Sequence, residues 1–189
     1  RLFLDGEEAL LLAILKPEER EANGCYGTRC RNPLLHPLVR MAIETAMRQG
    51  ELLSMCWENI RVADRVAHLP MTKNGSSRNV PLSSKAVEIL KALPRAIRGP
   101  VFPMSSNAVK LSFSRAVKRA RQCYEENGGK DERMLKDLHF HDLRHVAVSK
   151  LAEKLPNIVE LASVSGHADV RMLRRYYHPK AEELALKLG

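Results

Sequence analysis

The sequence predicts an α+β domain that is mostly helical and carries a small antiparallel β-sheet. Over most of the chain, apolar residues recur at three- and four-residue intervals, which is the spacing of one helical face. Residues 60–82 change to short β-branched runs with turn residues between them, a pattern typical of strands. A chain of 189 residues is long enough for one sizeable domain with its own core, so we expect residues 1–189 to form a single domain.

The N-terminal region predicts one helix followed by a loop. Asp5, with Glu8 three residues later, is typical of a capped helix start before the apolar run of residues 9–15. Residues 23–33 are rich in Gly and Asn and end in Pro, which favours a loop.

The next region predicts a helix and then the sheet. Residues 33–56 show helical periodicity, which Gly50 interrupts. Within residues 60–82, Asn74-Gly75 is a hairpin signal, so we expect two or three antiparallel strands there.

Serines mark the starts of the following helices. The segment 81–84 (Pro-Leu-Ser-Ser) caps a predicted helix over residues 85–93, and Ser105 or Ser106 begins another that reaches about Tyr124. This second helix carries five basic residues and no acidic residue between positions 109 and 121, which favours a DNA-facing surface over a merely solvated one. The five are Lys110, Arg115, Lys118, Arg119 and Arg121.

Composition narrows the class of protein. With 31 Lys and Arg against 22 Asp and Glu, the net charge is +9, which favours a polyanionic partner, although a solvated basic surface remains the alternative. No apolar run approaches the roughly 20 residues of a membrane span, so we expect no membrane partner. The cysteines Cys25, Cys30, Cys56 and Cys123 match neither a disulfide framework nor a zinc site, and they fit reduced thiols in the cytoplasm.

A cluster of candidate functional residues lies between His141 and Tyr176. His141 and Arg144 are three apart and share one helical face. His167 follows Arg144 by 23 residues, and Tyr176 comes nine residues after His167. Two basic donors facing one way with a phenol nearby suggest chemistry on a phosphodiester, although a His-x-x-Arg pair by itself is common on ordinary helices.

Upstream residues complete the pattern. Arg48 is flanked by apolar residues at a helix junction, where ionisable groups are paired or functional, and Glu51 is placed to pair with it or to orient a neighbour. Lys73 stands beside the predicted hairpin turn, where a lysine is normally only solvated. The ordered set over residues 4–188 resembles the catalytic signature of the tyrosine recombinase, or phage-type integrase, family: Arg48, Lys73, His141, Arg144, His167 and Tyr176.

The resemblance implies a role for each residue. Arg48 and Arg144 would bind the phosphate oxygens, because a guanidinium stays protonated and presents a planar fork. His167 would donate to a non-bridging oxygen, His141 would act as general base, and Lys73 would protonate the leaving 5′ oxygen. Tyr176 would attack phosphorus and form a 3′-phosphotyrosine, which stores the bond energy, so no cofactor or metal is implied.

Two tyrosines compete for the role of nucleophile. Tyr176 stands two residues before His178, as the nucleophile does in many relatives. Tyr177 is spaced with Val170 and Leu173 as part of an apolar stripe. Both observations favour Tyr176.

Departures from the family pattern and rival functions remain. Ser165 stands where many relatives have leucine, at a packing position. The family's helical core-binding domain is expected to be absent from this chain.

The resemblance implies recombination of specific DNA sites (integration, excision or inversion) by a DNA-bound tetramer. Accessory DNA-bending proteins are possible partners, and the expected location is a bacterial nucleoid or a phage-infected host. The alternatives are DNA relaxation of the type IB topoisomerase kind and a non-catalytic DNA-binding module of the same fold.

Overall fold

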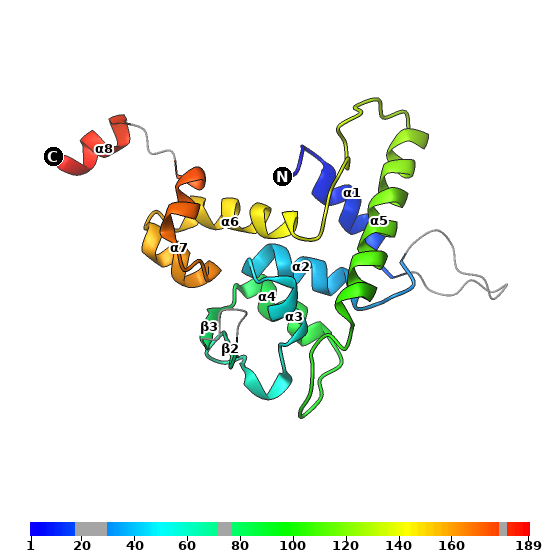
Figure 1. Cartoon of the computed structure of the whole chain (residues 1–189), viewed down its shortest axis with the longest axis horizontal. Coiled ribbons are helices and arrows are strands. Elements are labelled where there is room, and N and C mark those ends of the chain that lie inside the picture. The colour runs from blue at the N-terminus through cyan, green and yellow to red at the C-terminus, as the bar shows by residue number, and fades with distance from the viewer. Residues whose placement is uncertain (18–29, 72–76, 178–180) are drawn as a thin grey trace.

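The computed structural model describes residues 1–17, 30–71, 77–177 and 181–189. Helices dominate, with one three-stranded sheet on one side (Figure 1). In chain order the helices and strands are α1 (Glu7–Leu15), α2 (Leu35–Thr45), α3 (Gln49–Leu53), the 3₁₀ helix η1 (Trp57–Asn59), β1 (Ile60–Arg61), β2 (Val66–Leu69), β3 (Arg78–Pro81), α4 (Ser84–Ala92), α5 (Ser106–Glu126), α6 (Asp142–Lys154), α7 (Ile158–Ser165), the 3₁₀ helix η2 (Val170–Tyr176) and α8 (Ala181–Leu188). The predicted mostly helical α+β class is confirmed.

Helix α1 does not begin with the predicted Asp5 cap. Its N-cap is Gly6, whose φ of 78° lies in the left-handed region that glycine enters without steric cost. The carboxylate that reaches back is that of Glu7, which accepts the backbone N–H of Leu4 at 2.7 Å. Glu7 is fully buried, so it serves the interior and not only the helix end.

The predicted helix over residues 33–56 is two helices, and the break is at Ala46, not at Gly50. Ala46 adopts a left-handed φ of 53° at the end of α2, whereas Gly50 lies inside α3. Tertiary contacts stabilise this costly backbone, because Ala46 is fully buried and its carbonyl oxygen accepts a hydrogen bond from Arg144. The break turns the chain so that Arg48 precedes α3.

The sheet is antiparallel with three strands, within the predicted two or three, and the strand order is β1-β2-β3. Ala67 and Leu69 of β2 and Val80 of β3 are buried on one face, while His68 and Asn79 are exposed on the other. This alternation is the period of two expected of a half-buried strand. The hairpin signal Asn74-Gly75 lies outside the described residues.

The predicted serine caps form. Ser83 Oγ accepts the backbone N–H of Ala86 at the start of α4, and Ser105 Oγ accepts that of Ala108 at the start of α5, both at 3.1 Å. The long helix α5 buries Val109, Phe113, Ala116, Val117 and Ala120 along one side, next to α1 (Figure 1).

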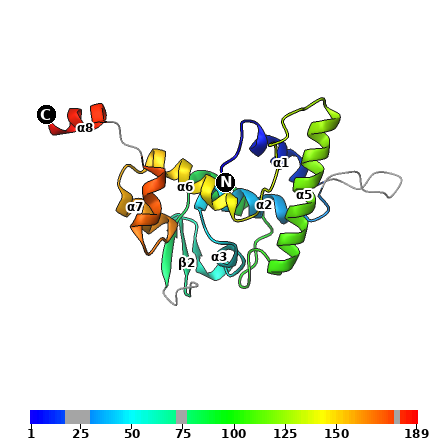
Figure 2. The ribbon, with the colours of Figure 1, turned by 45° about the horizontal axis from the view of Figure 1, so that its top comes forward.

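The C-terminal elements pack on a second, smaller core. Helix α6 lies along α2, and α7 and η2 pack against the C-terminal part of α6, as both views show (Figures 1 and 2). The buried members of this core are Ala46, Ala147, Val148, Leu161, Ala162 and Leu173, and Tyr176 and Tyr177 pack against it. Because the main core contains Leu143, helix α6 joins the two cores, and Arg144 lies where they meet.

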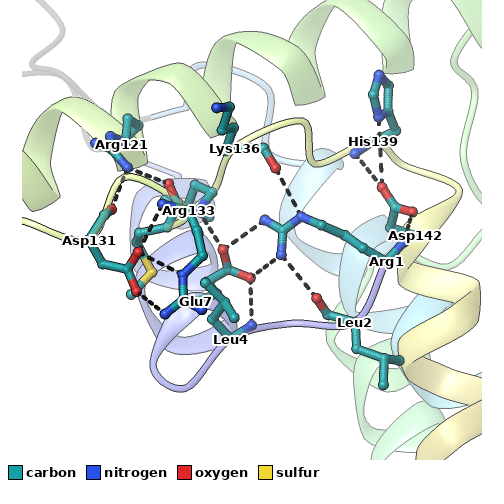
Figure 3. A network of polar contacts seen from close by, with 12 residues as sticks. Arg1, Leu2, Leu4, Glu7, Arg121, Asp131, Arg133, Lys136, His139 and Asp142 are labelled. Carbon is teal, nitrogen blue, oxygen red and sulfur yellow. Dashed lines mark hydrogen bonds and ion pairs between the residues drawn. The ribbon is translucent and has the colours of Figure 1, made fainter.

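A polar network fixes the approach to α6. Figure 3 shows the Glu7 carboxylate facing the Arg1 guanidinium. Glu7 accepts Nη1 and Nη2 of Arg1 at 2.8 and 2.7 Å, and it also accepts the backbone N–H of Leu135. Burial, the largest single effect, acts to raise the pKa of Glu7, but hydrogen bonds from the Arg1 side chain and from the backbone N–H groups of Leu135 and Leu4 outweigh it and lower that pKa below its ordinary value. The network therefore joins α1 to the segment that leads into the candidate site.

Candidate active site

A cavity of about 280 Å³ brings together five of the six residues that the sequence singled out. They come from the N-terminus of α3, the start of α6, the turn after α7 and the end of η2. Lys73 lies outside the described residues. The five are Arg48, His141, Arg144, His167 and Tyr176.

Glu51 joins two arginines beside this cavity. Its carboxylate accepts the backbone N–H of Arg48 at 2.9 Å and Nη1 of Arg48 at 3.0 Å, and it accepts Nη2 of Arg78 at 2.8 Å. Burial alone would raise the pKa of Glu51, but hydrogen bonds from Arg78 and Arg48 outweigh burial and lower it. Glu51 is therefore an anion that orients two cations, consistent with its predicted supporting position.

Arg144 is buried and held from two sides. Its Nη1 donates to the carbonyl oxygen of Ala46 at 2.5 Å, and its Nη2 lies 3.2 Å from Nε2 of His167. Burial and then the charge of Arg48 lower the pKa of Arg144 to about 10, which still leaves it protonated at neutral pH. Three arginines around one carboxylate leave this site cationic and suited to an anion.

A turn at Gly166 places His167 in the wall of the cavity. Gly166 ends α7 with a left-handed φ of 70°, and a Cβ there would lie 2.8 Å from Cζ of Arg78. The Gly166 carbonyl oxygen also accepts Nη2 of Arg48 at 3.1 Å. A side chain at this position would be strained by the left-handed turn and would also displace the Arg78 guanidinium, so glycine suits it.

Hydrogen bonds set the tautomer of His167. The hydroxyl of Ser165, fully buried, donates to the carbonyl oxygen of Leu161 at 2.6 Å, so its oxygen accepts from Nδ1 of His167 at 2.7 Å. Nε2 is left as the acceptor facing Arg144. Burial and the charges of Arg144 and Arg48 lower the pKa of His167 to about 4, so the ring is neutral at pH 7. Ser165 is buried as a packing residue would be, and it also orients His167.

The two adjacent tyrosines have different surroundings. The Tyr177 hydroxyl donates to the backbone carbonyl oxygen of Leu155, away from the cavity. Tyr176 lines the cavity, and its hydroxyl lies 2.6 Å from Nδ1 of His145. Of the two tyrosines, Tyr176 shares the cavity with Arg48 and Arg144.

His141 and His145 are one helical turn apart and face each other. Their rings meet edge to face with centroids 5.2 Å apart, and both line the cavity. Burial, the largest effect, lowers the pKa of both imidazoles, with positive neighbours adding to it, so both are neutral at pH 7. The hydrogen-bond contact with Tyr176 is made by His145.

The basic residues of α5 lie away from this cavity and divide between two sides of the helix. Lys110, Lys118 and Arg121 border a separate groove of about 430 Å³ between α5 and the segment that precedes α6. Arg121 also donates to the carbonyl oxygens of Asp131 and Met134 at 2.8 and 2.9 Å, so it holds a loop. Arg115 and Arg119 fall on the other side of the buried stripe. A DNA contact by these five residues stays a prediction.

Sequence reasoning overlooked Arg78, His145, Ser165 and Arg175 as site residues. A signal existed for His145, because it stands four residues after His141 and so shares its helical face. Arg78 carried no such signal, since it reaches Glu51 of α3 only in the folded chain, where β3 packs against α7. Its Nε is a buried nitrogen without a hydrogen-bond partner among the described residues.

In the described parts of the chain, no three His, Cys, Asp or Glu side chains gather in a way that could hold a metal ion. Over the same residues, no helix has the length and apolar character needed to cross a membrane. Cys25 of the CYGTRC segment lies outside the described residues.

Comparison with known proteins identifies relatives of this chain in sequence and in fold. The chain is 41% identical over 176 residues to the shufflon-specific DNA recombinase of Escherichia coli, covering 93% of this chain and 42% of that protein. The catalytic domain of bacteriophage HP1 integrase has the same fold, with a TM-score of 0.68 and 26% identity over 100% of this chain and 95% of that one. The Tn1549 transposon integrase in complex with transposon right end DNA is similar in fold, with a TM-score of 0.70 at 16% identity, covering 100% of this chain and 65% of that one.

The chain spans about half, or less, of the length of the curated recombinases and integrases that it matches. A family model described as the phage integrase family matches residues 25–183, which is most of the sequence. This chain therefore belongs to the phage integrase family of tyrosine recombinases.

Proposed function

We propose that this chain is the catalytic domain of a site-specific recombinase, which cuts and rejoins double-stranded DNA through a covalent tyrosine intermediate. The observation that carries the proposal is the cavity that Tyr176 shares with Arg48, Arg144 and neutral imidazoles, with the Tyr176 hydroxyl in hydrogen-bond contact with His145. Its contents suit a phosphodiester, which is anionic and needs both a nucleophile and charge stabilisation.

Arg48 and Arg144 bind the phosphate in this proposal. A phosphodiester gains negative charge at its non-bridging oxygens as the nucleophile approaches, and guanidinium groups are donors that stay charged. Glu51 and the Ala46 carbonyl hold the two side chains in advance, so little reorganisation is needed when DNA arrives.

His167 becomes a donor only when an anion is present. In the free protein, Nε2 of His167 accepts from Arg144, and Nδ1–H is engaged by Ser165. A neighbouring phosphate favours the protonated ring, which raises its pKa, and Nε2–H then donates to a non-bridging oxygen. Ser165 keeps the ring in place through both states.

Tyr176 is the nucleophile, and its proton leaves toward the imidazole pair of His141 and His145. The phenol has an ordinary pKa of about 10, so a nearby base is required at neutral pH. Lys73, which the family resemblance implies as the general acid, protonates the departing 5′ oxygen. The resulting 3′-phosphotyrosine is resealed by a 5′ hydroxyl without a cofactor.

Recombination requires several protomers on paired sites. Helix α8 lies apart from the body of the domain in both views, and its Leu186 and Leu188 are exposed (Figures 1 and 2). We expect this helix to contact a neighbouring protomer within a DNA-bound tetramer. The likeness to a shufflon-specific DNA recombinase favours strand exchange over relaxation of the type IB kind.

Covalent capture tests the proposed chemistry. The probe is a pool of nicked DNA duplexes with a randomised arm, in which cleavage near the nick releases a short oligonucleotide and traps the adduct. SDS-stable adducts are recovered and sequenced to give a selected duplex. We expect adducts with the native chain and with Tyr177→Phe, and none with Tyr176→Phe.

Each contrary result has a separate meaning. No adduct with the native chain would refute the covalent chemistry of this chain. Adducts with Tyr176→Phe and none with Tyr177→Phe would move the nucleophile by one residue. Relaxation of a supercoiled plasmid that lacks the selected sequence, without exchange between two selected sites, would favour the topoisomerase alternative.

A further inference from the structure

The hydroxyl of Tyr176 makes its hydrogen bond to a histidine that the family resemblance does not assign. Nδ1 of His145 lies 2.6 Å from Oη of Tyr176 and 3.0 Å from Nη2 of Arg175. The guanidinium of Arg175 also lies over the Tyr176 ring, 5.1 Å from its centroid. Three side chains from α6 and η2 thus meet at one imidazole nitrogen.

The two partners determine which way the hydrogen bond points. A guanidinium only donates, so Nδ1 of His145 must carry a lone pair, and the ring proton is on Nε2. An imidazole nitrogen with a lone pair cannot donate to a phenol, and therefore Tyr176 donates its proton toward Nδ1. This is the arrangement of a base and its substrate before proton transfer.

The position of His145 suits this transfer. Burial, then the charge of Arg175, lowers the pKa of His145, so the ring is neutral and able to accept. His145, Arg175 and Tyr176 line both the arginine-lined cavity and a second cavity of about 390 Å³. His145 is therefore accessible from a second side, which a small external base can reach while DNA occupies the first.

We infer that His145 is the immediate acceptor of the Tyr176 proton, with His141 supporting it through the edge-to-face ring contact. The inference rests on the proposed function. The O–H bond of Tyr176 breaks, its proton moves to Nδ1 of His145, and the oxygen forms the bond to phosphorus. The P–O5′ bond breaks, and the 5′ oxygen keeps its electron pair and takes a proton from the general acid. Resealing reverses each step.

Proton transfer has a consequence for Arg175. Once Nδ1 of His145 carries a proton, it has no lone pair for the guanidinium and repels it. Arg175 must then leave this nitrogen while the phenolate and phosphate gain charge beside it. The acceptor and the adjacent cation thus change partners in the same step.

Single-turnover cleavage of the selected duplex tests the inference. His145→Ala removes the acceptor, and His145→Asn keeps an oxygen near Nδ1 that can accept a hydrogen bond but cannot serve as the base. We expect the cleavage rate of both variants to fall by roughly 10²-fold or more, as loss of a general base predicts, while their DNA affinity stays unchanged. The matched control is His139→Ala, which removes an exposed histidine just before α6. This variant should cleave at the native rate.

Two rescue measurements separate chemistry from positioning. Added imidazole should restore cleavage by His145→Ala through the second cavity and should not restore cleavage by His141→Ala. A fluorinated tyrosine at position 176, whose phenol ionises more readily, should restore cleavage by His145→Asn. A structural role for His145 would respond to neither treatment.

Native cleavage by His145→Ala would overturn the inference. Slow cleavage that imidazole does not restore in His145→Ala and that the fluorinated tyrosine does not restore in His145→Asn would also overturn it. Imidazole rescue confined to His141→Ala would do the same. These outcomes leave the proposed function intact, because that function fails only if the native chain forms no adducts or relaxes DNA without exchanging selected sites.

Discussion

Glu51→Ala removes the carboxylate that joins Arg48 to Arg78, and we expect a large loss of stability. The Glu51 side chain is 3% exposed, and removing one partner of a buried ion pair costs about 3–5 kcal/mol. Arg48 is 28% exposed and can turn toward water, whereas Arg78 is 13% exposed and cannot do so easily. The expected cost is therefore near the lower end, at about 3 kcal/mol.

Urea and thermal unfolding measure this loss. For a chain of this size, about 3 kcal/mol corresponds to a Tm lower by roughly 6–12 °C. The matched control is Glu125→Ala. It removes an ion pair on the surface of α5, in which Oε1 of Glu125 lies 2.5 Å from Nε of Arg121. Because Glu125 is 53% exposed, we expect its loss to cost less than about 1 kcal/mol.

The pH dependence gives a second measurement of the same pair. The pKa of Glu51 is lowered in the folded state, so its stabilising effect is present above the unfolded pKa of about 4.3 and is lost as pH falls through the folded value. The gap in unfolding free energy between the native chain and Glu51→Ala should therefore narrow in acid. A cost no larger than that of Glu125→Ala, or a gap independent of pH, would refute the account of Glu51 as a buried anion.

Other predictions concern the chemical step. Arg144→Lys keeps the charge but loses the planar fork, and we expect cleavage to slow by about 10²–10³-fold with much less change in DNA affinity; equal losses would assign Arg144 to binding. Lys73→Ala should be rescued by a 5′-bridging sulfur, which leaves without protonation, and failure of that rescue would remove Lys73 from the role of acid. DNA binding should raise the pKa of His167 from about 4, seen by nitrogen NMR, and an unchanged value would exclude it as a cationic donor. Ser165→Ala should slow cleavage roughly fivefold, because loss of a hydrogen bond of about 1 kcal/mol lets His167 rotate, and an unchanged rate would leave Ser165 as a packing residue only.

The sequence by itself determined the class of fold, the family and the chemical types of the site residues. Helical periodicity, the serine caps at Ser83 and Ser105 and the β-branched runs are local signals, and the elements that they predict are present. Local signals failed at Ala46, because a buried left-handed alanine is stabilised by contacts far away in the chain. The same limit applied at α1, where Glu7 is buried and accepts the backbone N–H of Leu4, while Gly6 and not Asp5 is the N-cap.

Only the tertiary structure decided how the site residues are partnered. Arg48 donates to the Gly166 carbonyl oxygen across 118 residues, and Arg144 to that of Ala46 across 98. The assignment of Tyr176 over Tyr177 gained a physical basis only when their hydroxyls were seen to face different partners. Hydrogen-bond direction depends on atoms that meet in space, so the tautomers of His145 and His167 follow from the fold and from no pattern in the sequence.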